Sequence, residues 1–186
     1  MPRSRRGSSY VGSGVRVLLV VLVAFGLWVT RVGTRWPSIY YMTGPSMEPA
    51  VAPLEYYLAW SPAGDITRGD LVLFRFADDA DLFHVLRRVA GLPGDTVAMV
   101  AGVVSVNGVP QATPHRILRP LAWRSPYAIG GNLYDWGPWI VPPDSVVLLS
   151  DTRDIVGWPD SRFIGFVAIE DVVARATRTL RGRRLR

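Results

Sequence analysis

One serine in this sequence lies in a setting that could support nucleophilic chemistry. Ser46 falls in the stretch GPSMEPA, which follows soon after a long apolar segment. A serine hydroxyl becomes a strong nucleophile only when a base within hydrogen-bonding reach removes its proton. Taken alone, a serine among glycine and proline residues is typical of a turn. The chemistry of Ser46 therefore depends on the bases that the rest of the chain offers.

The composition excludes several of those bases. All 21 positively charged residues are arginines, and the chain contains neither lysine nor cysteine. Lysine general bases, lysine Schiff bases and thiolate nucleophiles are therefore excluded, as are disulfides and cysteine-type zinc sites. We predict no metal ion or other cofactor.

The apolar segment before Ser46 is long enough to cross a membrane. Residues 12–32 comprise 21 residues with Arg16 and Arg31 near the ends, which suffices for about 30 Å of hydrocarbon at about 1.5 Å per residue. A cleaved secretory signal has a similar charged start, but no small-x-small cleavage pattern follows. We therefore expect an uncleaved transmembrane helix over 12–32. More arginines precede the segment than follow it closely, which predicts a cytoplasmic N-terminus over 1–11.

The rest of the chain is patterned as short strands. Five runs are β-branched or aromatic and are bounded by Gly, Pro, Asp or Asn, namely 70–76, 84–91, 95–100, 103–108 and 145–150. The pairs Ala101-Gly102 and Asn107-Gly108 are typical of hairpin turns. We predict a mainly β, antiparallel, extracytoplasmic domain over 36–172.

Two segments lack the strand pattern. Residues 111–139 are rich in Pro, Gly, Trp and Tyr, and we expect an irregular insertion there. The arginine-rich residues 173–186 are predicted to be a basic tail. Neither basic end has the interleaved aromatic residues of a nucleic-acid stacking platform, so we expect membrane lipid as the partner and no nucleic acid. The sequence leaves the oligomeric state open.

Five stretches occur in an order that resembles type I signal peptidase. They are SMEPA (46–50), GDLVLF (69–74), RRVAGLPGDTV (87–97), VNG (106–108) and SDTRDIVGWPDSRFIGFV (150–167). RRVAGLPGD and DSRFIGFV are the specific ones. The resemblance implies strongly bent antiparallel β-sheets on the outer face of the cell membrane. It also implies a membrane-bound serine endopeptidase that removes signal peptides from exported preproteins.

The resemblance implies that Ser46 is the nucleophile, but the base is altered. Bacterial members place a lysine where this sequence has Arg87. A lysine can be desolvated until it is neutral, whereas a guanidinium keeps its proton with a pKa above about 12. Arg87 therefore cannot simply replace the base.

Strand periodicity predicts apolar surroundings for Arg87. It shares one face of its strand with three apolar residues, Phe83, Val85 and Val89. A guanidinium on such a face needs an anionic partner. We expect a salt bridge from Arg87 to Asp151 or Asp160.

His84 is the alternative base. Eukaryotic relatives use histidine where bacterial ones use lysine, and neutral imidazole is a competent base near pH 7. However, His84 lies three residues before Arg87, which places it on the opposite face of a regular strand and about 10 Å away. We expect a surface histidine unless a bulge turns it inward.

The resemblance assigns supporting roles as well. The Ser46 backbone N–H is the implied oxyanion donor. Asp160 and Arg162 form an implied structural ion pair, with Ser161 between them and Asp151 shortly before. The stretch SDTRDIVGW departs from the usual GDNR pattern at Ser150 and Thr152.

The implied substrate is an extended peptide bound as an added strand, with small side chains at the first and third positions before the cut. The segment expected to contact it carries Ile39, Tyr41, Gly44 and Pro45. We predict that Ser46 lies at the open end of a groove between this segment and the strand that carries Arg87.

Three hypotheses remain open at this point. The chain is an active signal peptidase, a non-catalytic homologue that binds signal peptides or assists an active paralogue, or a membrane-surface interaction protein with a β scaffold. The first two differ only at Arg87. The third predicts no peptide groove beside Ser46.

Overall fold

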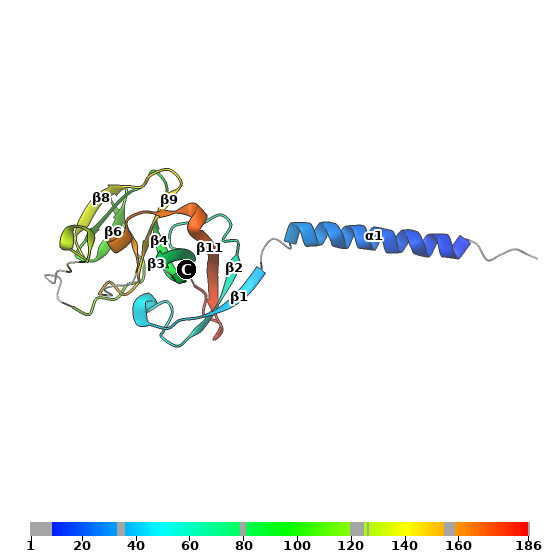
Figure 1. Cartoon of the computed structure of the whole chain (residues 1–186), viewed down its shortest axis with the longest axis horizontal. Coiled ribbons are helices and arrows are strands. Elements are labelled where there is room, and N and C mark those ends of the chain that lie inside the picture. The colour runs from blue at the N-terminus through cyan, green and yellow to red at the C-terminus, as the bar shows by residue number, and fades with distance from the viewer. Residues whose placement is uncertain are drawn as a thin grey trace, which may run out of the picture. The chain divides into compact units, whose positions relative to one another are not determined.

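The structure is a computed structural model that describes residues 9–32, 36–78, 81–119, 125, 127–154 and 159–185. It divides into two compact units, Met1–Trp36 and Pro37–Arg186. The first unit contains helix α1 (Ser9–Val32) (Figure 1). The apolar side chains of this helix between Val15 and Leu27 are exposed. Within the described part of the chain, no helix is both long and apolar enough to cross a membrane, so the transmembrane helix expected over 12–32 is not confirmed.

The second unit is built from two antiparallel sheets (Figure 1). The larger sheet has seven strands in the spatial order β1 (Trp36–Tyr41), β2 (Tyr56–Ser61), β11 (Val172–Thr179), β3 (Leu71–Asp78), β4 (Asp81–Gly91), β9 (Ser145–Leu149) and β10 (Val167–Ala168). The smaller sheet has four, in the order β7 (Val109–Pro110), β6 (Val103–Val106), β5 (Thr96–Val100) and β8 (Trp136–Ile140). The predicted mainly β, antiparallel fold is confirmed.

The predicted hairpin turns are present. Ala101 and Gly102 join β5 to β6 with φ values of 49° and 80°, and Asn107 and Gly108 join β6 to β7 with φ values of 52° and 79°. Positive φ at both central residues is the requirement of a type I′ turn, which glycine and asparagine meet most easily. The five predicted runs correspond to β3, β4, β5, β6 and β9.

The predicted basic tail over 173–186 is wrong. Residues 172–179 form β11, which lies between β2 and β3 inside the larger sheet. The buried positions of this strand are Ala174, Ala176 and Thr179. Small buried residues alternating with arginines give a weak hydropathy pattern, so the strand resembles a charged tail in the sequence. The compact unit accordingly does not end at residue 172.

The segment expected to be irregular, 111–139, is mostly so where it is described. It contains a short 3₁₀ helix at Ile129–Gly131 and an isolated bridge from Arg116 to Thr152. From Trp136 onward, however, the chain forms strand β8, which pairs with β5. Residues 120–124 and 126 of this segment lie outside the described residues.

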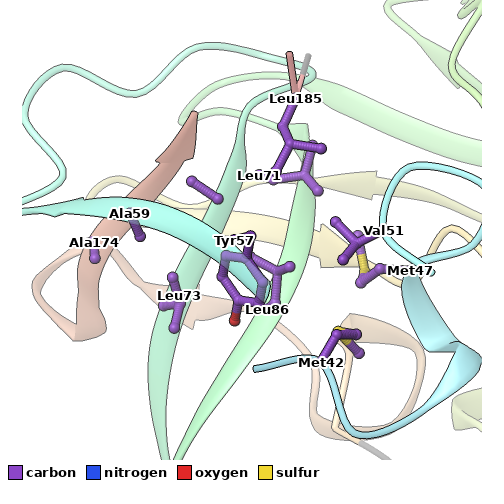
Figure 2. Close-up of a cluster of buried hydrophobic side chains, with 11 residues drawn as sticks. Met42, Met47, Val51, Tyr57, Ala59, Leu71, Leu73, Leu86, Ala174 and Leu185 are labelled. Carbon is purple, nitrogen blue, oxygen red and sulfur yellow. The ribbon is translucent and has the colours of Figure 1, made fainter. Parts of the chain in front are cut away.

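A buried cluster brings the two ends of the β unit together (Figure 2). Met42, Met47 and Val51 come from the segment around Ser46, Leu86 comes from β4, and Leu185 comes from the C-terminal end. Met47 and Val51 are fully buried. This cluster forms the support beneath the Ser46 turn.

Candidate active site

A short 3₁₀ helix, Pro45–Met47, presents Ser46. Proline at its first position has a fixed φ that suits the start of a helix. The backbone N–H of Thr152 donates to the Ser46 carbonyl at 2.9 Å, and the Thr152 hydroxyl donates to the Pro45 carbonyl at 2.6 Å. The Ser46 N–H donates to none of the described residues, so it remains available to a bound group. Thr152 thus holds the backbone on both sides of the Pro45–Ser46 peptide bond. Ser46 is only 7% exposed.

Arg87 lies directly beside the Ser46 hydroxyl. Its side chain is 1% exposed, and its NH1 group donates to Ser46 Oγ at 3.3 Å and to the Leu86 carbonyl at 2.6 Å. Nε and NH2 of Arg87 are buried and have no hydrogen-bond partner among the described residues. The salt bridge predicted between Arg87 and Asp151 or Asp160 is therefore wrong.

The two expected carboxylates are held by other arginines. Asp151 receives two hydrogen bonds of 2.7 Å from Arg88, and both side chains are buried. Asp160 forms a fully buried pair with Arg162 at 2.7 Å. Each carboxylate has a closer arginine with two-pronged geometry, which is the strongest arrangement for such a pair. Arg87 is left without a carboxylate of its own.

Asp160 organises the segment that follows it. Its side chain also accepts from the Ser150 N–H at 3.1 Å and from the Ser150 hydroxyl at 2.7 Å. Another bond comes from the backbone N–H of Arg162, so Asp160 caps helix α2 (Ser161–Ile164). Burial alone would raise the pKa of Asp160, but the charge and hydrogen bonds of Arg162 lower that pKa to about 2.

The electrostatic surroundings of Arg87 weaken its hold on a proton without removing it at neutral pH. Burial, together with the positive charge of Arg162, lowers the pKa of Arg87 to about 10 against the opposing effect of Asp160. Even with this lowered pKa, Arg87 keeps its proton at pH 7. The group next to Ser46 is a cation and a hydrogen-bond donor.

A cavity of about 370 Å³ opens beside Ser46. It is lined by residues 41–46 and by residues 83–87 of β4, together with Tyr57. A cavity therefore lies between the two segments where the peptide groove was predicted. Tyr41, Gly44 and Pro45 contribute to its lining, whereas Ile39 is 61% exposed and does not.

The cavity follows a strand edge that has no strand partner among the described residues. Strand β4 pairs with β3 from Asp81 to Arg88, but its pairing with β9 begins only at Arg88. Residues 83–87 therefore have one open edge, where an extended peptide can form backbone hydrogen bonds.

His84 lies on the same cavity. It is exposed, as expected, and its ring packs edge-on against Tyr40 with centroids 6.3 Å apart. None of its described contacts reaches Ser46. Strand alternation does not exclude His84 from the cavity, because the cavity lies along the open edge of β4 and is lined from both faces of that strand.

Comparison with known protein families shows which family this chain belongs to. The profile of the family "Signal peptidase, peptidase S26" matches residues 13–180. The chain belongs to this family.

Individual members of the family are moderately similar. Signal peptidase I of Leptolyngbya laminosa is 33% identical over 115 residues, which cover 59% of this chain and 50% of that protein. A probable signal peptidase I-2 of Synechocystis sp. is 29% identical over 181 residues, 91% of this chain and 72% of that protein. Signal peptidase I of Bacillus caldolyticus is 30% identical over 173 residues, 77% of this chain and 87% of that protein. The chain thus spans only half the length of the Leptolyngbya relative.

One solved structure, a signal peptidase I from Enterococcus faecalis, has 25% sequence identity to this member of the family. The comparison covers 59% of this chain and 95% of that chain, with a TM-score of 0.42.

Sequence reasoning missed two residues of this family member's site. In the sequence Thr152 is recognisable only as a departure from GDNR, yet its hydroxyl and N–H hold the Ser46 turn. Arg88 has no role in the sequence motifs, although it forms an ion pair with Asp151. The adjacent pair Arg87-Arg88 was the available signal, since residues next to each other on a strand point to opposite faces and need separate partners.

Proposed function

We propose that this chain binds the signal peptides of exported preproteins in the cavity beside Ser46 and acts on them as a serine endopeptidase of strongly reduced activity. One observation supports the strongly reduced endopeptidase activity. The group 3.3 Å from Ser46 Oγ is the guanidinium of Arg87, which donates a hydrogen bond where the reaction needs a proton acceptor.

The open edge of β4 supports peptide binding. An extended peptide can add to residues 83–87 as a strand, with the 41–46 segment on its other side. In this arrangement alternate side chains of the peptide face the protein, which agrees with small residues at the first and third positions before the cut. The third hypothesis, a membrane-surface scaffold without a groove, loses its support.

The cation beside Ser46 supports a slow reaction. Arg87 can stabilise a negatively charged Ser46 oxygen, but a protonated guanidinium cannot take up the serine proton. General-base catalysis typically contributes about 10²- to 10⁴-fold to a rate. We expect the protein to lack most of this factor at neutral pH.

A non-catalytic role is the second candidate. Arg87 is fully buried and cannot accept the serine proton. This observation favours a protein that binds signal peptides, or assists an active paralogue, without cutting them. The groove and the binding mode are the same in both cases. Only the rate of cleavage distinguishes the two functions.

We also propose that residues 12–32 attach the chain to the cell membrane as a single span, with residues 1–11 cytoplasmic and the β unit outside. The apolar composition of the segment and the arginines before it support this arrangement. Alkaline carbonate extraction of membranes tests it, and recovery of most of the full-length chain in the soluble fraction would overturn it.

The enzymatic proposal is tested by a preprotein cleavage assay with the full chain in detergent. We expect slow cleavage by the wild type and a gain of about 10²- to 10⁴-fold in Arg87→Lys, because a buried lysine can become neutral. Adding Ser46→Ala should abolish the gain, and His84→Ala should leave the wild-type rate unchanged.

Other outcomes are equally clear. Rapid wild-type cleavage that His84→Ala abolishes would identify His84 as the base. Rapid cleavage that is insensitive to His84→Ala would show that another base serves Ser46. No gain in Arg87→Lys, with peptide binding retained, would favour the non-catalytic role.

A further inference from the structure

The interior next to Ser46 contains more positive than negative charge. Four buried arginines lie in this region, Arg87, Arg88, Arg153 and Arg162. Asp151 forms an ion pair with Arg88, and Asp160 forms one with Arg162. A third carboxylate, Asp154, accepts hydrogen bonds from the Tyr134 hydroxyl and from two backbone N–H groups.

Arg87 and Arg153 differ in how they are satisfied. Arg153 donates to the carbonyls of Ser150 and Gly102, and none of its side-chain nitrogens is left buried without a partner. Arg87 keeps two buried nitrogens without a partner among the described residues. A buried charge with unused donors is strongly unfavourable unless a counter-ion binds.

The position of Arg87 indicates where that counter-ion comes from. Arg87 is one of the residues that line the cavity beside Ser46, and the rest of the lining is largely apolar, including Met42, Phe83 and Val85. The cavity also follows the open edge of β4. An extended peptide fits this shape and edge better than a small inorganic anion does.

We propose that this cavity is a binding site for the C-terminal carboxylate of a peptide, such as a signal peptide that has already been cut. The carboxylate lies beside Ser46 and pairs with Arg87. This inference rests on the proposed signal-peptide binding. It adds that the protein prefers a peptide whose C-terminus lies beside Ser46 to a peptide that continues past this point.

The chemistry of the two groups supports the preference. A peptide carboxylate is ionised at pH 7, since its pKa is about 3.5. Carboxylate and guanidinium can form two parallel, charge-assisted hydrogen bonds. An uncut preprotein places a neutral peptide group at the same point and leaves Arg87 unneutralised. A lysine that must be neutral to act as a base would not provide this attraction.

The test compares two peptides that differ only at the C-terminus. A fluorescently labelled signal-type peptide ending in Ala-Gln-Ala is prepared as the free acid and as the amide. Binding to the full chain in detergent is measured by fluorescence anisotropy at pH 7. We expect the free acid to bind the wild type about tenfold to a hundredfold more tightly than the amide.

Two variants assign the preference to Arg87. Arg87→Met should bind both peptides with equal affinity. The matched control is Arg178→Met, which removes one exposed arginine from β11 and should keep the full preference.

Each alternative result is decisive. Equal binding of the acid and the amide by the wild type, which needs no variant, would overturn the carboxylate site but leave signal-peptide binding intact. Binding of neither peptide would overturn both. Inorganic phosphate serves as a third probe, and a site that binds phosphate through Arg87 without preferring the acid peptide is a small-anion site, which would also overturn the proposal.

Discussion

At the scale of single residues, Arg87 and Arg88 are neighbours in the chain with opposite surroundings. Arg88 makes a two-pronged bond to Asp151 and a third bond to the Gly69 carbonyl. Arg87 has no carboxylate partner and two buried nitrogens without partners among the described residues. Arg88 therefore stabilises the fold, whereas the buried and partly unsatisfied Arg87 destabilises it.

The first prediction compares the two arginines. Arg88→Met should lower the free energy of unfolding by about 3–5 kcal/mol, because Asp151 is left as an unpaired buried charge. Arg87→Met should raise it by about 1–3 kcal/mol, because unsatisfied buried donors are removed. Urea unfolding followed by tryptophan fluorescence measures both. Equal losses in the two variants would contradict the assignment of partners.

At the scale of elements, the Ser46 turn depends on a loop more than a hundred residues away. The Thr152 hydroxyl bonds to the Pro45 carbonyl and lies 3.2 Å from the Glu48 carbonyl. Its N–H bonds to the Ser46 carbonyl. The turn is therefore fixed from the segment that also carries Asp151.

The second prediction removes only the hydroxyl of this contact. Thr152→Val should lower the free energy of unfolding by about 1 kcal/mol, and it should also reduce the cleavage rate of an Arg87→Lys background, because the turn is less constrained. Thr152→Ser keeps the hydroxyl and is the control. If both variants behave like the parent in both assays, Thr152 does not position Ser46.

The third prediction concerns the cap of α2 in acid. The folded-state pKa of Asp160, about 2, lies below the ordinary value of 3.8. The unfolded chain therefore binds the proton first, so this group's stabilisation is present above about pH 4 and is lost as the pH falls toward 2. The size of the effect is about 2 kcal/mol.

Unfolding measured at pH 7, 4 and 2.5 should therefore show a steeper acid loss in the wild type than in Asp160→Asn. The asparagine variant should also be less stable at pH 7, because it leaves Arg162 without its counter-charge. Parallel pH profiles for the two proteins would show that Asp160 does not titrate as described.

At the scale of the whole β unit, the C-terminal end completes the core beneath the active site (Figure 2). Leu185 is 4% exposed and belongs to the same cluster as Met42, Met47 and Val51. Its backbone N–H bonds to the Thr177 carbonyl, which holds the last residues against β11. The Ser46 turn thus rests partly on the other end of the chain.

The fourth prediction tests this packing. Leu185→Ala should lower the free energy of unfolding by about 2–4 kcal/mol, as expected for a buried leucine. Leu180→Ala is the matched control, because Leu180 is 56% exposed, and its effect should stay within about 0.5 kcal/mol. Similar small effects in both variants would show that Leu185 does not contribute to the core and would support the prediction of a C-terminal tail.

Local patterns in the sequence were sufficient for much of the fold. The β-branched runs of β3, β4, β5, β6 and β9 and the two hairpin turns depend on near neighbours in the chain, and these can be read directly. Motif order gave the family, the position of Ser46 and the groove beside it. The replacement of the usual lysine by Arg87 was also visible in the sequence alone.

The tertiary structure decided which charges meet. The sequence offered Asp151 and Asp160 as partners for Arg87, but side-chain direction and distance gave them to Arg88 and Arg162. It likewise turned an arginine-rich C-terminal segment into a central strand, because the small residues Ala174 and Ala176 fit between β2 and β3. A salt bridge or a buried strand depends on contacts between residues that are far apart in the chain. Composition and periodicity describe only near neighbours and do not determine which distant residues meet.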